Sequence, residues 1–352
     1  MSIIQHHGEM NTDPKDLLFL LLGEPEFGFS TDGTFAFFTS PNSSFGITFS
    51  GDNIEVINEI PSGMVRRISL FEGQDLIADI VLGAPVGFDD ILLEKSFVAF
   101  CDILFGNGGD ATVIGSTAND IVRSTSNNDN VASGPGDDKV LGSAGVDQND
   151  GGEGMDTFSL KDLSGSGSID LKTGQYENGA NSGTLANFEN AEGNNAKNQI
   201  IGNGQMNYLW GLGGRDSIHA RGGNDMMDGG KGGDVLFGDG GNDDIKGGTG
   251  NDRISGGQGS DSLNGQKGND LMNGDAGNDK MTGGDGEDVL NGGRGNDRLD
   301  GGSGNDTVNG GAGDDKLFGG HGNDTLDGGA GVNELRGEGG NDVRSEERRG
   351  GE

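Results

Sequence analysis

Apolar residues recur on a nine-residue period through the second half of the chain. From Gly193 to Ser345 the sequence divides into 17 nonapeptides without an insertion or deletion. Position eight of the nonapeptide is apolar in 16 copies, from Ile200 to Leu335, and the exception is Arg344. One inward apolar side chain between two polar neighbours predicts a short strand of about three residues in each copy.

The other half of each nonapeptide predicts a turn. Position one is Gly in 16 copies and position four is Gly in 15, so the first six residues follow the pattern GGxGxD. Glycine permits positive φ and close approach of the backbone. Alternating turns and strands predict an all-β coil in which two nonapeptides complete a revolution and successive coils stack as parallel strands. A solvated Gly- and Asp-rich linker is the alternative, but a linker has no reason to keep an aliphatic residue in phase.

A change of pattern along the chain predicts its domain organisation. The predicted parts are a disordered tail (1–16), a small β-rich domain (17–105), a degenerate block of six nonapeptides (106–159), a β-rich interlude (160–192), the main block of 17 nonapeptides (193–345) and a charged tail (346–352). In the small domain, phenylalanines alternate about Asp32-Gly33 in "FGFSTDGTFAFF", which predicts an antiparallel hairpin. These rings are expected to form packed core, with an exposed face that binds a surface or glycan as the alternative.

Composition and charge narrow the classes of partner. Of 352 residues, 74 are glycine and only 30% are hydrophobic, so the chain cannot form one large apolar core. Its 58 acidic and 23 basic residues give a net charge of −35. This charge repels nucleic acid and anionic membrane surfaces, so neither is an expected partner. Metal cations are the natural partners of such a chain.

Two further classes are disfavoured. The longest uniformly apolar run, Leu17–Leu22, has six residues, whereas a membrane-spanning helix needs roughly 20. This run also lacks the charged flank and cleavage site of a general secretory signal peptide. The single cysteine, Cys101, permits no intramolecular disulfide.

The acidic residues of the repeat fall at one position. Position six is Asp in 14 copies of the main block and Asn in Asn198, Asn207 and Asn333. Stacking would bring the Asp of one copy beside that of the copy 18 residues on, such as Asp297 beside Asp315, and two negative charges then need a counter-ion. Carboxylates and turn carbonyls form an all-oxygen shell, which suits Ca²⁺ better than Mg²⁺. The four histidines lack the ligand spacing that zinc requires.

The candidate calcium ligands are therefore the position-six aspartates. We expect a cooperative calcium-dependent transition, weakened most by Asp→Ala in the middle of the main block, such as at Asp270 or Asp279. The candidates in the degenerate block are Asp120, Asp129, Asp138, Asp147 and Asp156. Those in the main block are Asp216, Asp225, Asp234, Asp243, Asp252, Asp261, Asp270, Asp279, Asp288, Asp297, Asp306, Asp315, Asp324 and Asp342.

Individual copies such as "GGTGNDRIS", "GGRGNDRLD", "GGSGNDTVN" and "GGHGNDTLD" resemble the RTX (repeats-in-toxin, haemolysin-type) calcium-binding nonapeptide. The resemblance covers 207 of 352 residues, and the repeat region is similar to the C-terminal region of serralysin-type proteases. It implies a right-handed parallel β-roll with Ca²⁺ between adjacent turns, held by position-six Asp and turn carbonyls. It also implies export by type I secretion machinery and folding outside the cell, although only Glu346–Glu352 follow the repeats, where this family carries its export signal.

No catalytic motif accompanies the repeats: H-E-x-x-H, G-x-S-x-G and the P-loop are all absent from the sequence. The leading hypothesis is a secreted, extracellular, calcium-binding protein with a structural or adhesive role, not an enzyme, with a cell-surface or glycan target. The alternative is the non-catalytic C-terminal part of a type I-secreted hydrolase or toxin. A cytosolic calcium buffer is disfavoured because sites of this kind usually need near-millimolar calcium.

Overall fold

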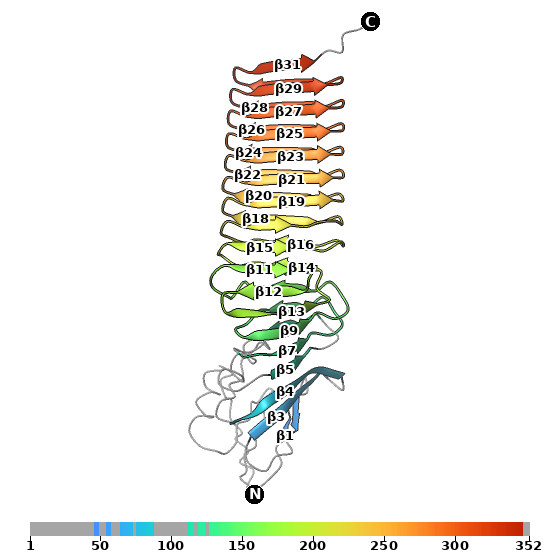
Figure 1. Ribbon diagram of the computed structural model, residues 1–352, viewed down its shortest axis with the longest axis vertical. Helices are drawn as coiled ribbons and strands as arrows, with labels where there is room; N and C mark the ends of the chain where they lie inside the picture. Colours follow the sequence, from blue (N-terminus) through green and yellow to red (C-terminus); the bar gives the residue numbers. More distant parts are fainter. Residues whose placement is uncertain are drawn as a thin grey trace, which may run out of the picture. The chain divides into compact units, whose positions relative to one another are not determined.

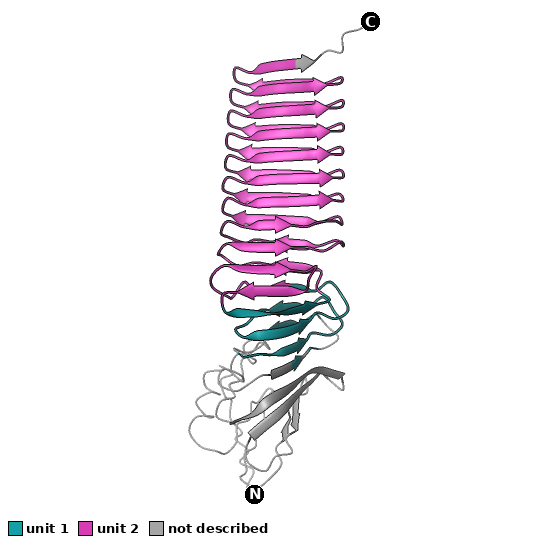
Figure 2. Cartoon of the chain, in the orientation of Figure 1, with its two compact units in different colours: residues 1–157, 180–187 teal, residues 158–179, 188–352 magenta. Residues whose placement is uncertain are grey.

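The computed structural model describes residues 46–48, 54–57, 64–72, 75–87, 111–115, 119–123 and 127–347. Every regular element among them is a β-strand (Figure 1). The chain divides into two compact units, one formed by Met1–Thr157 with Ala180–Asn187 and the other by Phe158–Gly179 with Phe188–Glu352 (Figure 2). No described segment forms a helix long and apolar enough to cross a membrane.

The first described strands of unit one are antiparallel. They are β1 (Gly46–Thr48), β2 (Ile54–Ile57), β3 (Met64–Glu72) and β4 (Asp75–Gly87). Each pairs antiparallel with the next, and β4 pairs antiparallel with β5 (Ala111–Ile114). The hairpin expected about Asp32-Gly33 lies outside the described residues.

The degenerate repeats of the first unit form short parallel strands. Their bounds are β6 (Ile121–Arg123), β7 (Asn130–Ala132), β8 (Lys139–Leu141), β9 (Val146–Asp150) and, from the interlude, β13 (Asn181–Ala186). Strands β5, β7, β9 and β13 pair in parallel, in that order, and β6 pairs in parallel with β8. Consecutive strands of the sequence thus alternate between two layers.

The second unit starts with the remaining strands of the interlude. They are β10 (Thr157–Ser159), at the boundary of the two units, β11 (Gly167–Asp170), β12 (Gln175–Asn178) and β14 (Asn190–Glu192). Strands β11 and β12 form an antiparallel hairpin, and β11 also pairs in parallel with β15, the first strand of the main block. The region predicted as a β-rich interlude therefore carries strands, including one antiparallel pair.

The main block is a parallel β-solenoid, consistent with a β-roll, that places alternate copies in two sheets. One sheet contains β15 (Asn198–Ile201), β17 (Ser217–His219), β19 (Val235–Gly240), β21 (Arg253–Gln258), β23 (Leu271–Ala276), β25 (Val289–Arg294), β27 (Thr307–Ala312), β29 (Thr325–Ala330) and β31 (Val343–Glu347). The other contains β16 (Tyr208–Trp210), β18 (Met226–Lys231), β20 (Asp244–Thr249), β22 (Ser262–Lys267), β24 (Lys280–Asp285), β26 (Arg298–Ser303), β28 (Lys316–His321) and β30 (Glu334–Gly339).

The core of the solenoid is a stack of position-eight side chains. Each lies directly opposite its counterpart 18 residues on, as Ile254 lies opposite Met272. From Ile200 to Leu326 these side chains are at most 3% exposed. The nine-residue spacing thus supplies the core from both sheets, because alternate copies lie in different sheets and every copy contributes one buried aliphatic residue.

The strands of the main block are longer than the sequence predicts. From β18 to β30 each strand has six residues, covering positions seven to nine of one copy and one to three of the next. Pairing continues through the glycines, since Gly257 pairs with Asp275 at position two. The turn is therefore confined to positions four to six, and the three-residue estimate holds only for early strands such as β16 and β17.

Candidate metal centre

The turns at the two edges of the solenoid gather the position-six residues into two columns, which we call column one and column two. Column one precedes the strands of the β15–β31 sheet, and column two precedes those of the β16–β30 sheet. Column one contains Asn198, Asp216, Asp234, Asp252, Asp270, Asp288, Asp306, Asp324 and Asp342. Column two contains Asn207, Asp225, Asp243, Asp261, Asp279, Asp297, Asp315 and Asn333.

Within each column, hydrogen bonds connect neighbouring turns. The Oδ1 atom of each Asp accepts a hydrogen bond from the backbone N–H of the position-six residue 18 positions earlier. Asp297 donates to Asp315 in this way at 2.9 Å, so the neighbours predicted from the sequence are in contact. The same bond recurs from Asp216 to Asp324 at 2.7–2.9 Å. One carboxylate oxygen of each Asp is thereby fixed by the backbone.

Position five carries a second ladder that the sequence reasoning missed. The Oδ1 of Asn296 accepts a hydrogen bond from the N–H of Asp314, 18 residues later, at 2.8 Å, and Asn323 accepts one from Asn341 at 2.9 Å. This ladder runs opposite in direction to the position-six ladder. The frequent "ND" pair at positions five and six was the sequence signal that could have predicted this ladder. The Asn accepts a hydrogen bond from a backbone N–H of the following turn, and the Asp accepts one from the preceding turn.

In the main block from Asp216 to Asp324, the second oxygen of each position-six carboxylate has no protein partner. In all 13 aspartates from Asp216 to Asp324, Oδ2 is buried and accepts no hydrogen bond. These residues are only 1–2% exposed. A buried acceptor without a partner typically costs about 1–3 kcal/mol, and more when it carries charge. Such a row of oxygens therefore fits a cation-binding site.

The position-one glycine shows what surrounds this oxygen. At Gly292, the point where a Cβ atom would stand lies 2.5 Å from Oδ2 of Asp297 and 2.5 Å from the carbonyl oxygen of Gly310. At Gly301 the corresponding distances are 2.5 Å to Asp306 and 2.6 Å to Gly319. A side chain at position one would fill this space. Glycine at position one therefore keeps carboxylate and carbonyl oxygens close together.

Asn333 serves as a natural control for the chemistry of this space. Its Oδ1 keeps the ladder by accepting a hydrogen bond from the N–H of Asp315 at 2.9 Å. Its Nδ2, which stands in place of the second carboxylate oxygen, donates to the carbonyls of Gly328 at 2.8 Å and Gly329 at 3.2 Å. At Asn333 a hydrogen-bond donor, Nδ2, thus occupies the place where the Asp copies have an acceptor, Oδ2. In the Asp copies the same carbonyls would face a carboxylate oxygen, and a cation between them would relieve the repulsion.

Burial also changes the acidity of these carboxyls. Desolvation raises the pKa of Asp252 and Asp279 to about 7, opposed by the hydrogen bond from the backbone and reinforced by neighbouring aspartates. The same causes raise the pKa of Asp297 to about 6. In metal-free surroundings these groups therefore favour the neutral form more than an ordinary Asp does.

These shifts predict how the metal-free fold depends on pH. The folded-state pKa lies above the unfolded value of 3.8, so stability is greatest below about pH 4 and falls as pH rises toward 7. In chelator, acidification from pH 8 to pH 5 should therefore increase the β signal in circular dichroism, because it favours the folded metal-free state. In saturating calcium the same acidification should lower the thermal midpoint, because protons compete with the metal. A β signal in chelator that falls on acidification would contradict the burial of these carboxyls.

The first two turns of the main block differ from the rest. The Oδ1 of Asn198 accepts a hydrogen bond from the backbone N–H of Asn194, in the same copy, at 2.8 Å. The Oδ1 of Asn207 accepts one from the N–H of Asn203 in the same way at 2.9 Å. Position four is Ala196 or Gln205 here, neither of which has the positive φ of the later glycines. These amides have internal partners and make weak ligands.

The degenerate block in the first unit retains part of the pattern. The N–H of Asp120 donates a hydrogen bond to Oδ1 of Asp138 at 2.8 Å. The N–H of Asp138 in turn donates one to Oδ1 of Asp156 at 2.8 Å. Asp147 accepts from Asp129 at 3.0 Å in the same way. The Oδ2 of Asp147, however, accepts a hydrogen bond from the hydroxyl of Ser143 at 2.9 Å. Its second oxygen is therefore already engaged, unlike those of the main block.

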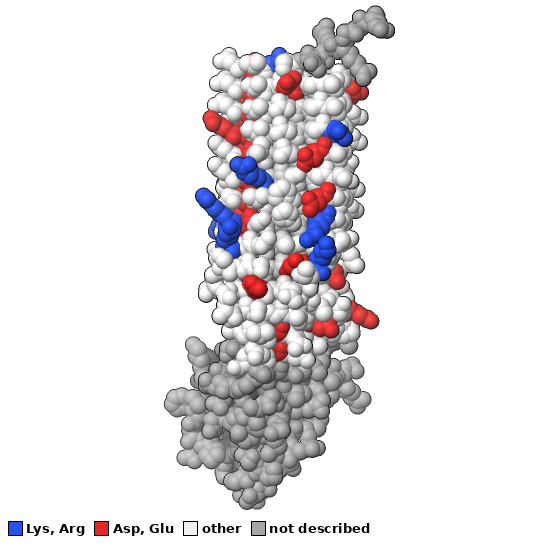
Figure 3. Space-filling model, viewed as in Figure 1, with Lys and Arg blue, Asp and Glu red and all other residues white. Residues whose placement is uncertain are grey.

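The donor set of the main block fits a hard cation. Within the described part of the chain, no three His, Cys, Asp or Glu side chains converge on one point. A metal between turns would therefore take one or two carboxylates and complete its shell with backbone carbonyls, including those at position one. Oxygen-only shells of this kind suit Ca²⁺. On the visible described surface, acidic and basic side chains are interspersed (Figure 3).

Comparison with known proteins identifies the repeat. No curated protein matches the chain. The model of the RTX calcium-binding nonapeptide repeat (4 copies) matches residues 105–140, 123–158, 201–236, 237–272, 264–299, 273–308, 282–317, 300–335 and 309–343. Its nonapeptides are calcium-binding repeats, and their number implies multiple Ca²⁺ ions. Because the matches cover more than half of its length, the chain belongs to the RTX calcium-binding nonapeptide repeat family.

Proposed function

We propose that calcium binding between the turns folds the main block into an extracellular module with a structural or adhesive role. The observation that carries this proposal is the set of 13 buried, unpartnered Oδ2 atoms in columns one and two. Several such penalties together exceed the roughly 5–15 kcal/mol by which a domain is typically stable. A cation in each turn removes the penalty, so binding and folding are coupled.

The setting follows from the affinity expected of such sites. Extracellular calcium modules commonly have Kd values on the order of 10⁻⁴–10⁻³ M, concentrations that the cytosol does not reach. The family match supports secretion, since RTX repeat proteins are typically secreted. We propose export through type I secretion machinery in the calcium-free, unfolded state, with the position-six aspartates from Asp120 to Asp324 as ligands after export.

The direct test is a calcium titration of the purified chain, followed by far-ultraviolet circular dichroism. We expect weak β signal in chelator and a cooperative gain of β signal as calcium rises into the millimolar range. Magnesium at equal concentration is the control and should not produce this gain, because its strict octahedral geometry suits these turns poorly. A β signal of equal strength in chelator and calcium would contradict calcium-driven folding.

A second role is open to the same fold. The chain could be the non-catalytic C-terminal part of a secreted hydrolase or toxin, since the family match covers only calcium-binding repeats. Two observations would separate the roles: hydrolase assays on the calcium-loaded chain, and the presence or absence of a hydrolase or toxin gene directly upstream. For the adhesive role, we expect calcium-dependent retention on a cell surface or glycan, lost in chelator.

A further inference from the structure

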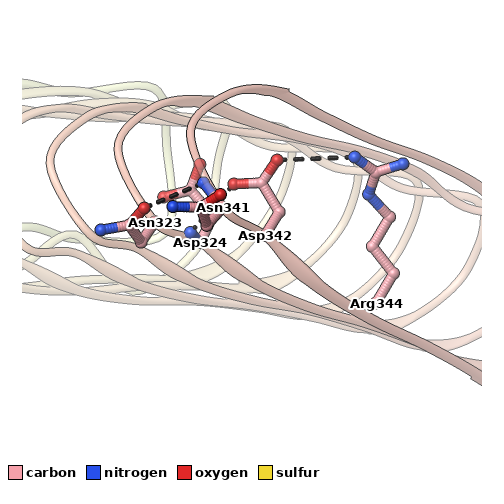
Figure 4. A network of polar contacts seen from close by, with 5 residues as sticks. All are labelled: Asn323, Asp324, Asn341, Asp342 and Arg344. Carbon is pink, nitrogen blue, oxygen red and sulfur yellow. Dashed lines mark hydrogen bonds and ion pairs between the residues drawn. The ribbon is translucent and has the colours of Figure 1, made fainter.

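The last turn of column one differs from every turn before it. Arg344 occupies position eight, where the other copies of the main block carry an apolar residue. Its guanidinium Nη2 lies 3.4 Å from Oδ2 of Asp342 (Figure 4). The Asp342 side chain is 3% exposed, whereas that of Arg344 is 50% exposed. Asp342 is thus the one column-one aspartate whose second oxygen has a cationic partner within the described chain.

The guanidinium stands where, in earlier turns of the main block, the next turn contributes a carbonyl oxygen. At Gly310, the point of a Cβ atom lies beside Oδ2 of Asp315 and 2.7 Å from the carbonyl of Gly328, one turn on. At Gly337 the same point lies beside Oδ2 of Asp342 and 2.5 Å from Nη2 of Arg344. In the last turn a positive donor therefore replaces a carbonyl acceptor. A metal ion at this point would meet a cation instead of a ligand.

Column two ends in an equivalent way. Its last member, Asn333, is neutral and donates through Nδ2 to the carbonyls of Gly328 and Gly329. Both columns therefore close on a nitrogen donor that satisfies the oxygens of the turn. The ladder itself continues to the end, because Oδ1 of Asp342 accepts a hydrogen bond from the N–H of Asp324 at 3.2 Å.

We propose that Arg344 closes column one as a built-in counter-ion, so that the turn of Asp342 binds no calcium. Arg344 thereby holds the position-six carboxylate of the last described turn without metal. The assignment removes Asp342 from the calcium ligands expected from the sequence, and it rests on calcium binding by the interior turns.

Native mass spectrometry of the full chain, with calcium as the added metal, counts the bound ions. Asp342→Asn should bind the same number of ions as the unchanged protein. Arg344→Leu, which restores the usual apolar residue at position eight, should bind one more ion between the Asp342 carboxylate and the carbonyls of its own copy, the two positions that Asn333 contacts at Gly328 and Gly329. The double variant Arg344→Leu/Asp342→Asn should return to the original number. Asp306→Asn, in the interior of the same column, is the control and should lose at least one ion.

The variants separate the possible failures. Loss of an ion from Asp342→Asn would overturn the proposal, because it would show that Asp342 is a ligand in the presence of Arg344. This result does not depend on whether Arg344→Leu folds its last turn. An unchanged count in Arg344→Leu would also overturn it. An unchanged protein that binds no calcium would instead refute the proposed function, and with it this assignment.

Discussion

Asp270→Asn should change stability in opposite directions with and without calcium. Asp270 is 2% exposed and lies in the middle of column one, with its Oδ1 bonded to the N–H of Asp252 at 2.8 Å and its Oδ2 unpartnered. Asn keeps the Oδ1 bond and replaces Oδ2 by a donor, as Asn333 already does. In chelator we therefore expect a gain of about 1–3 kcal/mol, because a buried unpaired acceptor is removed.

In calcium the same substitution should destabilise the protein, because a charged ligand is lost. At a free calcium concentration roughly 100 times Kd, losing one site costs about 2.7 kcal/mol. The calcium midpoint should rise and the transition should become shallower, since each interior Asp contacts the turn on either side. The measurement by circular dichroism is denaturant unfolding at several calcium concentrations. Because we expect only a weak β signal in chelator, the chelator arm is a titration with a stabilising osmolyte, whose midpoint reports the free energy of folding.

The matched control is Asp285→Asn, which makes the same charge change at an exposed position-three residue outside the position-six columns. It should leave both stabilities within about 0.5 kcal/mol of the original. If Asp270→Asn lost stability in chelator as well, the unpartnered oxygen would not be a source of strain, and the argument for a cation there would fail.

Gly295→Ala should unfold the main block or destabilise it by more than about 4 kcal/mol, a loss of the size that few single substitutions cause. Gly295 occupies position four with φ of 126°, a conformation that residues with a Cβ atom rarely adopt. An added Cβ would also collide with the carbonyl oxygen of Gly277, one turn earlier. Because the turns are stacked, neither turn can move away without breaking the ladder between them.

Gly293→Ala, at position two of the same copy, should cost less than Gly295→Ala but still roughly 2 kcal/mol or more. At the φ of 106° its added Cβ would lie 2.3 Å from the carbonyl oxygen of Asp275, so the backbone must shift toward a left-handed φ near 70°. The chain itself shows that position two adapts. Asp275, the register partner of Gly293, has φ of 69°, and Leu212 at position two has φ of 70°. Thermal unfolding in saturating calcium would compare the two variants. Equal losses would contradict the distinction between the two glycine positions.

Much of this architecture could be predicted because the repeat is short and strictly periodic. The phase of position eight identified the core, and Ile254 and Met272 are stacked as that phase requires. The spacing of position six identified which carboxylates meet, as at Asp297 and Asp315. Both predictions need only the period of the chain, because a solenoid repeats the same local contacts in every turn.

The sequence by itself determined the all-β solenoid, its aliphatic core, the columns of carboxylates and the need for a cation. Only the tertiary structure decided that one oxygen of each interior carboxylate of the main block accepts a hydrogen bond and the other has no protein partner, since the ladder bond depends on a backbone N–H of another turn. It likewise decided that strands run through the paired glycines, and that Arg344 faces Asp342 although the period marked it as a misfit in the core. These features depend on contacts between turns 18 residues apart, and nothing within one nonapeptide specifies the direction of a side-chain oxygen or of a terminal guanidinium.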